Sequence, residues 1–307
     1  MKGKDAMTEF FADRPFAQLR STVPAAAVIL AFALAGLTSA AQEQNGKETR
    51  IDVAPGATVN IVNNAGSVHL KAAAGSRQVV VAYTLHSNKV EVDQEITRDK
   101  RRIEIRTHAL PDQKPTPEEA RVDYDISVPS GVMVNVTTST APITAEGLSG
   151  DITLESDTGQ ITVSNVLRSH LHAHSVAGTV QLTNVNLGLD DVSTTSGAIQ
   201  LNNVNGPKVK IASGSGNITY QGECSGAGEY SFTTHSGNID MTLPETASVD
   251  LTARSASGGV ENDFPLQAKK HSTFVPKAGS SFSGTSNSGL SSVELRSING
   301  KIRVKKQ

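Results

Sequence analysis

Five related segments follow one another through the middle of the 307-residue chain. They read SDTGQITVSNV, SVAGTVQLTNV, TTSGAIQLNNV, SGSGNITYQGE and THSGNIDMTL. Their glycines recur at a nearly constant interval and are Gly159, Gly178, Gly197, Gly216 and Gly237. A unit this short cannot bury an apolar face by itself, so the copies must stack to form a continuous core. The repeat therefore restricts the chain to stacked-repeat architectures.

Apolar residues alternate with polar ones on both sides of each glycine. The positions two and four after it hold Ile161/Val163, Val180/Leu182, Ile199/Leu201, Ile218/Tyr220 and Ile239/Met241. The positions seven and five before it hold Ile152/Leu154, Leu171/Ala173, Val209/Ile211 and Tyr230/Phe232, with one polar exception, Asp190, in the pair Asp190/Val192. Alternation with period two is typical of half-buried β-strands, so each repeat is predicted to contain two short strands.

We predict an all-β fold of the single-stranded β-solenoid (β-helix-like) type, with about 19–21 residues and two short strands per coil. The coils would lie about 4.8 Å apart along the axis. Glycine at the corner would supply a positive φ without strain. Asn165, Asn184 and Asn203 stand at the same place after three of the glycines and would stack as an asparagine ladder. A sandwich or propeller is the alternative, but a propeller blade needs about 40 residues.

The repeat weakens towards both ends of the chain. Gly258 continues the spacing after Gly237, but Gly300 follows only after an interval twice as long, before a predicted C-terminal hairpin. Residues 42–136 are rich in predicted strands but less regular, and we expect them to start the solenoid and cap its open edge. The expected organisation is one continuous domain over residues 51–304, in which the solenoid repeats occupy residues 137–307.

Residues 1–41 have the parts of a secretory signal peptide. Basic residues precede the apolar run VPAAAVILAFALAGL, and small residues, TSAAQ, follow it. The run is shorter than the roughly 20 apolar residues of a membrane span, which makes an uncleaved anchor the alternative. No later segment is apolar enough to span a membrane, so we expect an exported protein in the periplasm, on the outer surface or outside the bacterial cell.

Charge, cysteine content and motifs exclude several classes of chemistry. The net charge is −2, so we expect no nucleic-acid partner. The only cysteine, Cys224, rules out an internal disulfide framework and gives no metal pattern. The sequence contains no G-x-S-x-G elbow, no phosphate-binding loop with its lysine and no zinc-ligand spacing. We therefore predict no catalytic residues and no cofactor.

One segment, SHLHAHSVAG, places three histidines at alternate positions, where they would share the outward face of a strand. In the repeat frame this face brings carboxylates from adjacent coils beside the imidazoles. The weak candidates for a divalent-ion site are His170, His172, His174, Glu155 and Asp191. The alternatives are an incidental exposed strand, or a patch whose positive charge rises as histidine protonates below about pH 6.5.

Two further outward-facing sets are candidates for contact with a partner. After each glycine the outward residues are small and polar: Gln160/Thr162, Thr179/Gln181, Ala198/Gln200, Asn217/Thr219 and Asn238/Asp240. This face suits weak, multivalent contact with glycans or another sheet, or it is only a solvated surface. On the last strand, Lys301, Arg303 and Lys305 alternate onto one face. They would protect an edge strand or contact anionic polymers.

Three stretches resemble a bacterial family of exported "putative adhesin" domains of unknown function. They are IDVAPGATVNIVNNAGSVHL, DISVPSGVMVNVTTSTAPI and the succession of S-x-S-G-x-I-x-L coils ending in INGKIRV. The resemblance covers residues 51–304 and implies a β-solenoid attached to, or secreted from, the cell envelope. It supplies no catalytic residues.

We therefore expect a non-enzymatic, envelope-associated binding or scaffolding module with a repetitive polar face. Its expected partners are envelope polysaccharide, peptidoglycan or another envelope protein. One alternative is a carbohydrate-active β-helix enzyme of the lyase or hydrolase type, which would show clustered carboxylates in a groove across neighbouring coils. The other is a structural element that self-associates through an uncovered terminal coil.

Overall fold

The computed structural model describes residues 46–186, 188–224, 227–268 and 281–307. The predicted signal peptide, residues 1–41, lies outside these ranges. The described residues form 25 β-strands in two sheets whose regular coils pair in parallel, which confirms the predicted all-β solenoid. Within this described part, no helix is long and apolar enough to cross a membrane.

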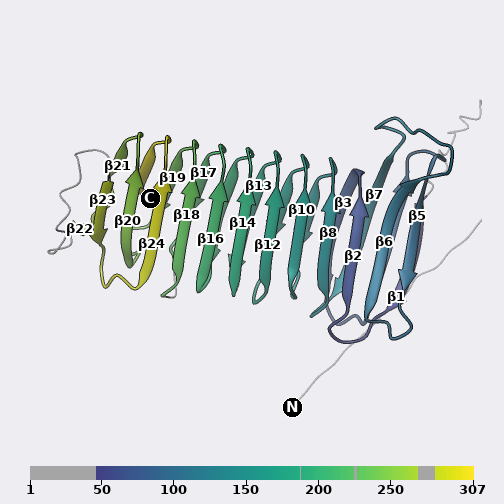
Figure 1. Ribbon diagram of the computed structural model, residues 1–307. Coiled ribbons are helices and arrows are strands. Elements are labelled where there is room, and N and C mark those ends of the chain that lie inside the picture. Colours follow the sequence, from purple (N-terminus) through teal and green to yellow (C-terminus); the bar gives the residue numbers. More distant parts are fainter. Residues whose placement is uncertain (1–45, 187, 225–226, 269–280) are drawn as a thin grey trace, which may run out of the picture. The chain divides into compact units, whose positions relative to one another are not determined.

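Sheet A contains 12 strands and sheet B contains 13 (Figure 1). In spatial order, sheet A consists of β1 (Gly46–Asp52), β4 (Gln78–Leu85), β7 (Arg121–Pro129), β3 (Ala65–Ala73), β9 (Ile143–Glu146), β11 (Ile161–Ser164), β13 (Val180–Asn186), β15 (Ile199–Asn205), β17 (Ile218–Gln221), β19 (Ile239–Leu243), β25 (Ile302–Lys306) and β21 (Val260–Asn262). Sheet B consists of β22 (Gln267–Ala268), β23 (Ser281–Thr285), β20 (Val249–Ser255), β24 (Ser291–Ser297), β18 (Glu229–Thr234), β16 (Lys208–Ser213), β14 (Leu189–Thr194), β12 (His170–Ser175), β10 (Ile152–Ser156), β8 (Met133–Thr138), β2 (Thr58–Asn63), β6 (Arg102–Ala109) and β5 (Val90–Ile96).

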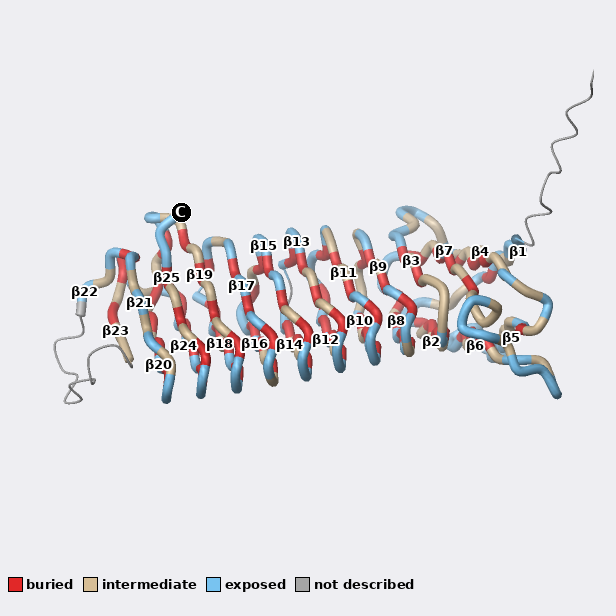
Figure 2. The backbone as a smooth tube through the Cα atoms, turned by 90° about the horizontal axis from the view of Figure 1, so that it is seen from above, coloured by how far each residue is buried: buried red, intermediate tan, exposed pale blue. Residues whose placement is uncertain are grey.

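Each regular coil consists of a strand of sheet B, a corner that contains the repeated glycine, and a strand of sheet A. Neighbouring coils pair in parallel, so Leu171 lies beside Ile152 and Val180 lies beside Ile161, its counterpart one repeat earlier in the sequence. The alternating apolar residues are buried between the two sheets and form one hydrophobic core. Figure 2 marks the buried residues in red along the stacked coils. This stacking gives the repeats the shared core that no single coil could form.

None of the repeated glycines has a positive φ in the described structure. Glycine is required at these corners because neighbouring backbones pack closely there. The prediction that the glycines supply left-handed corners is wrong. A Cβ atom built on Gly216 would lie 1.8 Å from the carbonyl oxygen of Gly197, and one on Gly197 would lie 2.0 Å from that of Gly178. Each corner therefore sits directly on the backbone of the preceding coil, where only glycine fits.

The left-handed conformation belongs to the asparagines instead. Asn165, Asn184 and Asn203 have φ values of 56°, 53° and 53°. Asparagine tolerates this region better than most residues, because its short side chain makes local hydrogen bonds. The amide of Asn184 donates to Oδ1 of Asn165 at 3.4 Å, and that of Asn203 donates to Oδ1 of Asn184 at 3.1 Å. The predicted ladder is therefore present.

A buried hydroxyl stands three positions before each repeated glycine. In six coils it accepts a hydrogen bond from the glycine N–H at 2.8–3.0 Å; the donors are Gly159, Gly178, Gly216, Gly237, Gly258 and Gly300. In a seventh, Thr194 donates to the carbonyl oxygen of Gly197 at 2.6 Å. Since buried backbone groups must be paired, these hydroxyls explain why serine or threonine recurs at this position.

The order of coils in space differs from their order in the chain at the C-terminal end. Strand β24 lies between β18 and β20, and β25 lies between β19 and β21. Figure 1 shows the last segment, in yellow, inserted between green strands. After β18 and β19 the chain passes over the position of one coil and forms β20 and β21. It then returns, and β24 and β25 occupy the position between them.

The basic last strand is consequently internal, and the prediction that it forms a protective edge is wrong. Arg303 contacts Asp240 of the preceding coil through two bonds, of 2.5 Å and 3.1 Å. Lys301 pairs with Glu261 on the other side. These positive charges therefore join three coils together, because β25 has acidic neighbours on both flanks.

A similar exchange occurs at the N-terminal end. Strand β2 lies between β8 and β6, and β3 lies between β9 and β7. Strands β1, β4 and β5 extend the two sheets beyond them in antiparallel pairing. The predicted capping by less regular β-structure is thereby confirmed. The expected division at residue 136 falls inside β8.

Candidate functional site

The outer side of sheet A carries rows of uncharged polar side chains in lateral register. Gln181, Gln200 and Thr219 are neighbours on three successive coils. Thr183, Asn202 and Gln221 form the next row along the same strands. We call these six residues the polar face. They line a shallow hollow of about 310 Å³.

The polar face combines amide and hydroxyl groups, which donate and accept hydrogen bonds. The side chain of Gln181 donates to that of Gln200 at 3.2 Å, so part of its capacity is used between coils. The remaining groups point to solvent, and Gln200 and Thr219 are exposed. Repetition at the strand spacing of about 4.8 Å presents equivalent groups at regular intervals. Such a surface can bind a polymer whose own polar groups recur.

The three histidines of the sequence motif lie on β12 and point outward, as predicted. His170 and His172 are exposed and His174 is half-buried. Their partners differ: Nδ1 of His170 lies 2.9 Å from a carboxylate oxygen of Asp151, and Nδ1 of His174 lies 2.9 Å from Oγ of Ser193. Sequence reasoning missed Asp151, although it stands one repeat interval before His170 and so occupies the same row.

The structure places the remaining candidate metal ligands beside these histidines but does not bring the set together. Glu155 neighbours His174, and Asp191 neighbours His172. Asp191 forms an ion pair with Lys210 at 3.4 Å. Among the described residues, no three ligand atoms of this set lie within 4.8 Å of one another. Since the side chains are spread along β12 and over its two neighbours, β10 and β14, a cation here would need them to move.

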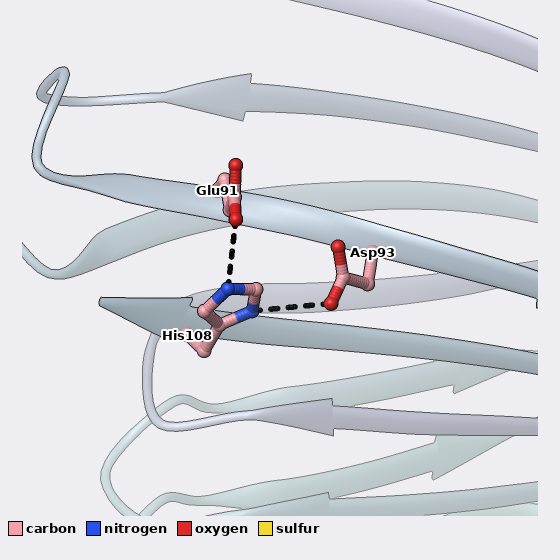
Figure 3. Close-up of side chains that lie close together, drawn as sticks. All are labelled: Glu91, Asp93 and His108. Carbon is pink, nitrogen blue, oxygen red and sulfur yellow. Dashed lines mark hydrogen bonds and ion pairs between the residues drawn. The ribbon is translucent and has the colours of Figure 1, made fainter. Parts of the chain in front are cut away.

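A different group has the closeness that a metal site requires. Glu91 and Asp93 on β5 flank His108 on β6, as Figure 3 shows. Nε2 of His108 lies 2.9 Å from a Glu91 oxygen, and Nδ1 lies 3.4 Å from an Asp93 oxygen. Both ring nitrogens thus face carboxylates of β5, the edge strand of sheet B. Sequence reasoning missed the group because its two strands have no repeat spacing.

A serine, a histidine and an aspartate also meet near the N-terminal end. Ser67 donates to Oδ1 of Asp123 at 2.8 Å, and Nε2 of His86 lies 2.6 Å from Oδ2. Partial burial acts to raise the pKa of Asp123, but the two hydrogen bonds and the electrostatic effects of His86 and Arg121 together lower it. In a catalytic triad the histidine must stand between serine and carboxylate. Here Asp123 stands in the middle, so His86 cannot activate Ser67.

Two titratable side chains are buried in the core. Asp190 occupies an inward position on β14 and is fully buried, and neither of its carboxylate oxygens has a hydrogen-bond partner among the described residues. Burial raises its pKa to about 7. Cys224 is buried, and burial raises the pKa of its thiol to about 12. Its backbone N–H donates to the Tyr220 hydroxyl at 3.1 Å. A protonated, inaccessible thiol is a poor nucleophile and a poor metal ligand.

These features define an in-register parallel β-solenoid that displays uncharged polar rows on its outer side. Residues 51–305 match the model of the family described as Toastrack DUF4097, and the chain belongs to this family. The match confirms the resemblance to a domain family of unknown function. No curated protein matches the sequence.

Solved bacterial structures that the comparison matches share little sequence with the chain. A protein described as a putative adhesin from Bacteroides fragilis NCTC 9343 is 9% identical, with a TM-score of 0.35, and covers 85% of this chain and 97% of its own. A putative adhesin from Parabacteroides merdae ATCC 43184 is 12% identical, with a TM-score of 0.34 and coverage of 86% and 97%. A putative cell adhesion protein from Clostridium sporogenes ATCC 15579 is 15% identical, with a TM-score of 0.29 and coverage of 85% and 100%.

Proposed function

We propose that the protein is a non-enzymatic, exported binding module of the bacterial cell envelope, and that it contacts an envelope polysaccharide or peptidoglycan through the polar face. The observation that carries this proposal is the alignment of Gln181, Gln200 and Thr219 in one row over three coils. The signal-peptide pattern of residues 1–41 supports export.

Repetition compensates for weak individual contacts. A hydrogen bond from an exposed amide or hydroxyl contributes only about 0.5–1.5 kcal/mol, because water competes for the same groups. Several contacts along one polymer act together, since the first raises the effective concentration of the next. The polar face therefore favours a long, hydroxyl-rich partner over a small molecule.

The lining of the hollow argues for binding and against hydrolysis at this face. General acid–base cleavage of a glycan needs two carboxyl groups on either side of the scissile bond. The side chains of the polar face are amides and hydroxyls, and they do not ionise near neutral pH. The face can hold a sugar chain, but it has no group that would protonate a leaving oxygen.

A binding array of neutral glycans and peptidoglycan fragments tests the proposal. The wild-type protein should bind at least one polymer, and a variant with Gln181→Ala, Gln200→Ala and Gln221→Ala should lose most of that binding. A matched variant on the outer side of sheet B, Thr153→Ala with Ser231→Ala, should bind like wild type. Equal binding by the two variants, or glycan cleavage by the wild type, would contradict the proposal.

A further inference from the structure

A groove of about 750 Å³ lies near the C-terminal end, along the outer side of sheet B. Among the described residues, the arginines or lysines and carboxylates that line it are Arg254 on β20 and Arg296 on β24, both arginines. Hydroxyl groups surround the two guanidinium groups, and His235 lies at the corner. The groove is on the opposite sheet from the polar face, so it is a separate site.

The two arginines are direct neighbours. They are paired in the register of β20 and β24, two parallel strands that lie about 4.8 Å apart. Like charges in this position repel each other and destabilise the sheet. Arg296 is only partly compensated, by Glu294 at 3.7 Å. Among the described residues, no carboxylate lies within ion-pair distance of Arg254.

The surroundings of this pair are suited to a sugar chain. In the same lateral row, Ser281 flanks Arg254 on one side and Thr233 flanks Arg296 on the other. The row therefore reads hydroxyl, guanidinium, guanidinium, hydroxyl. Phe282 and Ile298, the latter 47% exposed, add apolar surface to the lining. Sugars can contact both the polar and the apolar groups of this lining, because their hydroxyls form hydrogen bonds and their C–H groups pack on apolar side chains.

We propose that this groove binds an acidic polysaccharide through its carboxylate groups. A guanidinium group presents a planar fork of N–H donors that matches a carboxylate, and such charge-assisted bonds are stronger than neutral ones. Two adjacent forks can hold carboxylates on the same polymer and remove the repulsion between the arginines. This site goes beyond the function proposed for the polar face, and either can fail without the other.

The proposal is tested by titrating the purified protein with polygalacturonate and measuring the heat of binding by calorimetry. Arg254→Gln and Arg296→Gln should each weaken binding by about tenfold or more, because each loses a charge-assisted hydrogen-bond pair. Arg254→Lys, which keeps the charge and loses the fork, should fall between wild type and Arg254→Gln. The control Arg101→Gln, at the other end of the solenoid, should bind like wild type.

Two further polymers distinguish binding through carboxylate groups from binding through the sugar chain or through another anion. Methyl-esterified polygalacturonate keeps the sugar chain and loses the carboxylates, so it should bind at least about tenfold more weakly. A phosphorylated mannan should also bind more weakly than polygalacturonate, and tighter binding would overturn the assignment to carboxylates. Thermal unfolding confirms that each variant is folded. Unchanged affinity in the folded Arg254→Gln, Arg296→Gln double variant would overturn the site itself.

Discussion

Replacing Asp190 by valine should stabilise the protein at neutral and alkaline pH. Asp190 is the polar exception at the position seven residues before the repeated glycine, and its neighbours on the adjacent coils are Leu171 and Val209. Both carboxylate oxygens are buried, and within the part of the chain that the structure describes neither has a hydrogen-bond partner. A valine has a similar size and matches the apolar surroundings, so the replacement removes a buried acid without creating a large cavity.

The difference in pKa sets the magnitude and the sign of the effect. Burial raises the pKa of Asp190 from 3.8 to about 7. Between these values the folded protein holds a proton that the unfolded chain has released, so the free energy of unfolding decreases as pH rises. At about 1.4 kcal/mol per pH unit, the full loss is about 4 kcal/mol and is complete above pH 7. Below about pH 4 Asp190 is protonated in both the folded and the unfolded state, and this pH-dependent loss of unfolding free energy disappears.

Urea unfolding of wild type and Asp190→Val at pH 4.5 and pH 8 measures this effect. The stability gained by the variant should be larger at pH 8 by about 3–4 kcal/mol, since the contributions of all other groups cancel in the comparison. Asp190→Asn should remove the same pH dependence while leaving a buried polar group. The control Asp191→Asn affects an exposed ion pair and should change stability by less than about 1 kcal/mol. An equal gain at both pH values would refute the reasoning.

Three further sets of substitutions test the corners of the coil. Gly216→Ala should cost about 3 kcal/mol or more in unfolding free energy, because its Cβ would lie 1.8 Å from a backbone oxygen. Gly75→Ala, with open space but a φ of +72°, should cost only about 1–2 kcal/mol in the same denaturation assay, and equal losses would contradict the steric explanation. Asn184→Ala should lower the melting temperature more than Asn184→Gly, because both lose the ladder bonds but only alanine is strained at φ 53°; the reverse order would show that the conformation is unimportant. Ser175→Ala should cost about 1–3 kcal/mol by leaving the N–H of Gly178 unpaired, and a loss of amide-exchange protection at Gly178 would identify the cause.

The sequence by itself determined the regular part of this protein. A constant repeat interval pairs each residue with its counterpart on the next coil, so the frame correctly oriented Leu171 and Ala173 inward and the histidines of β12 outward. It also predicted the asparagine ladder. These inferences succeeded because parallel, in-register stacking turns a sequence interval directly into a lateral contact.

The role of the glycines and the order of the terminal coils were decided only in three dimensions. The sequence shows a glycine at each corner, but only the distance between coils shows that the space beside it is filled by backbone. In the repeat frame Arg254 and Arg296 have equivalent positions before Gly258 and Gly300. Their lateral pairing depends on β24 lying directly beside β20, although the interval between the two glycines is twice the repeat and predicts a coil between them.

The clusters near the N-terminal end also depended on tertiary structure. Ser67, His86 and Asp123 come from three segments that are not separated by the repeat interval. The same holds for His108 and its two carboxylate partners. Several strand orders bury the same alternating apolar residues, because hydrophobic burial depends on which face a side chain occupies and hardly on which strand is its neighbour. Alternation therefore specifies the two faces of a strand, and only the complete set of backbone pairings selects the strands that lie side by side.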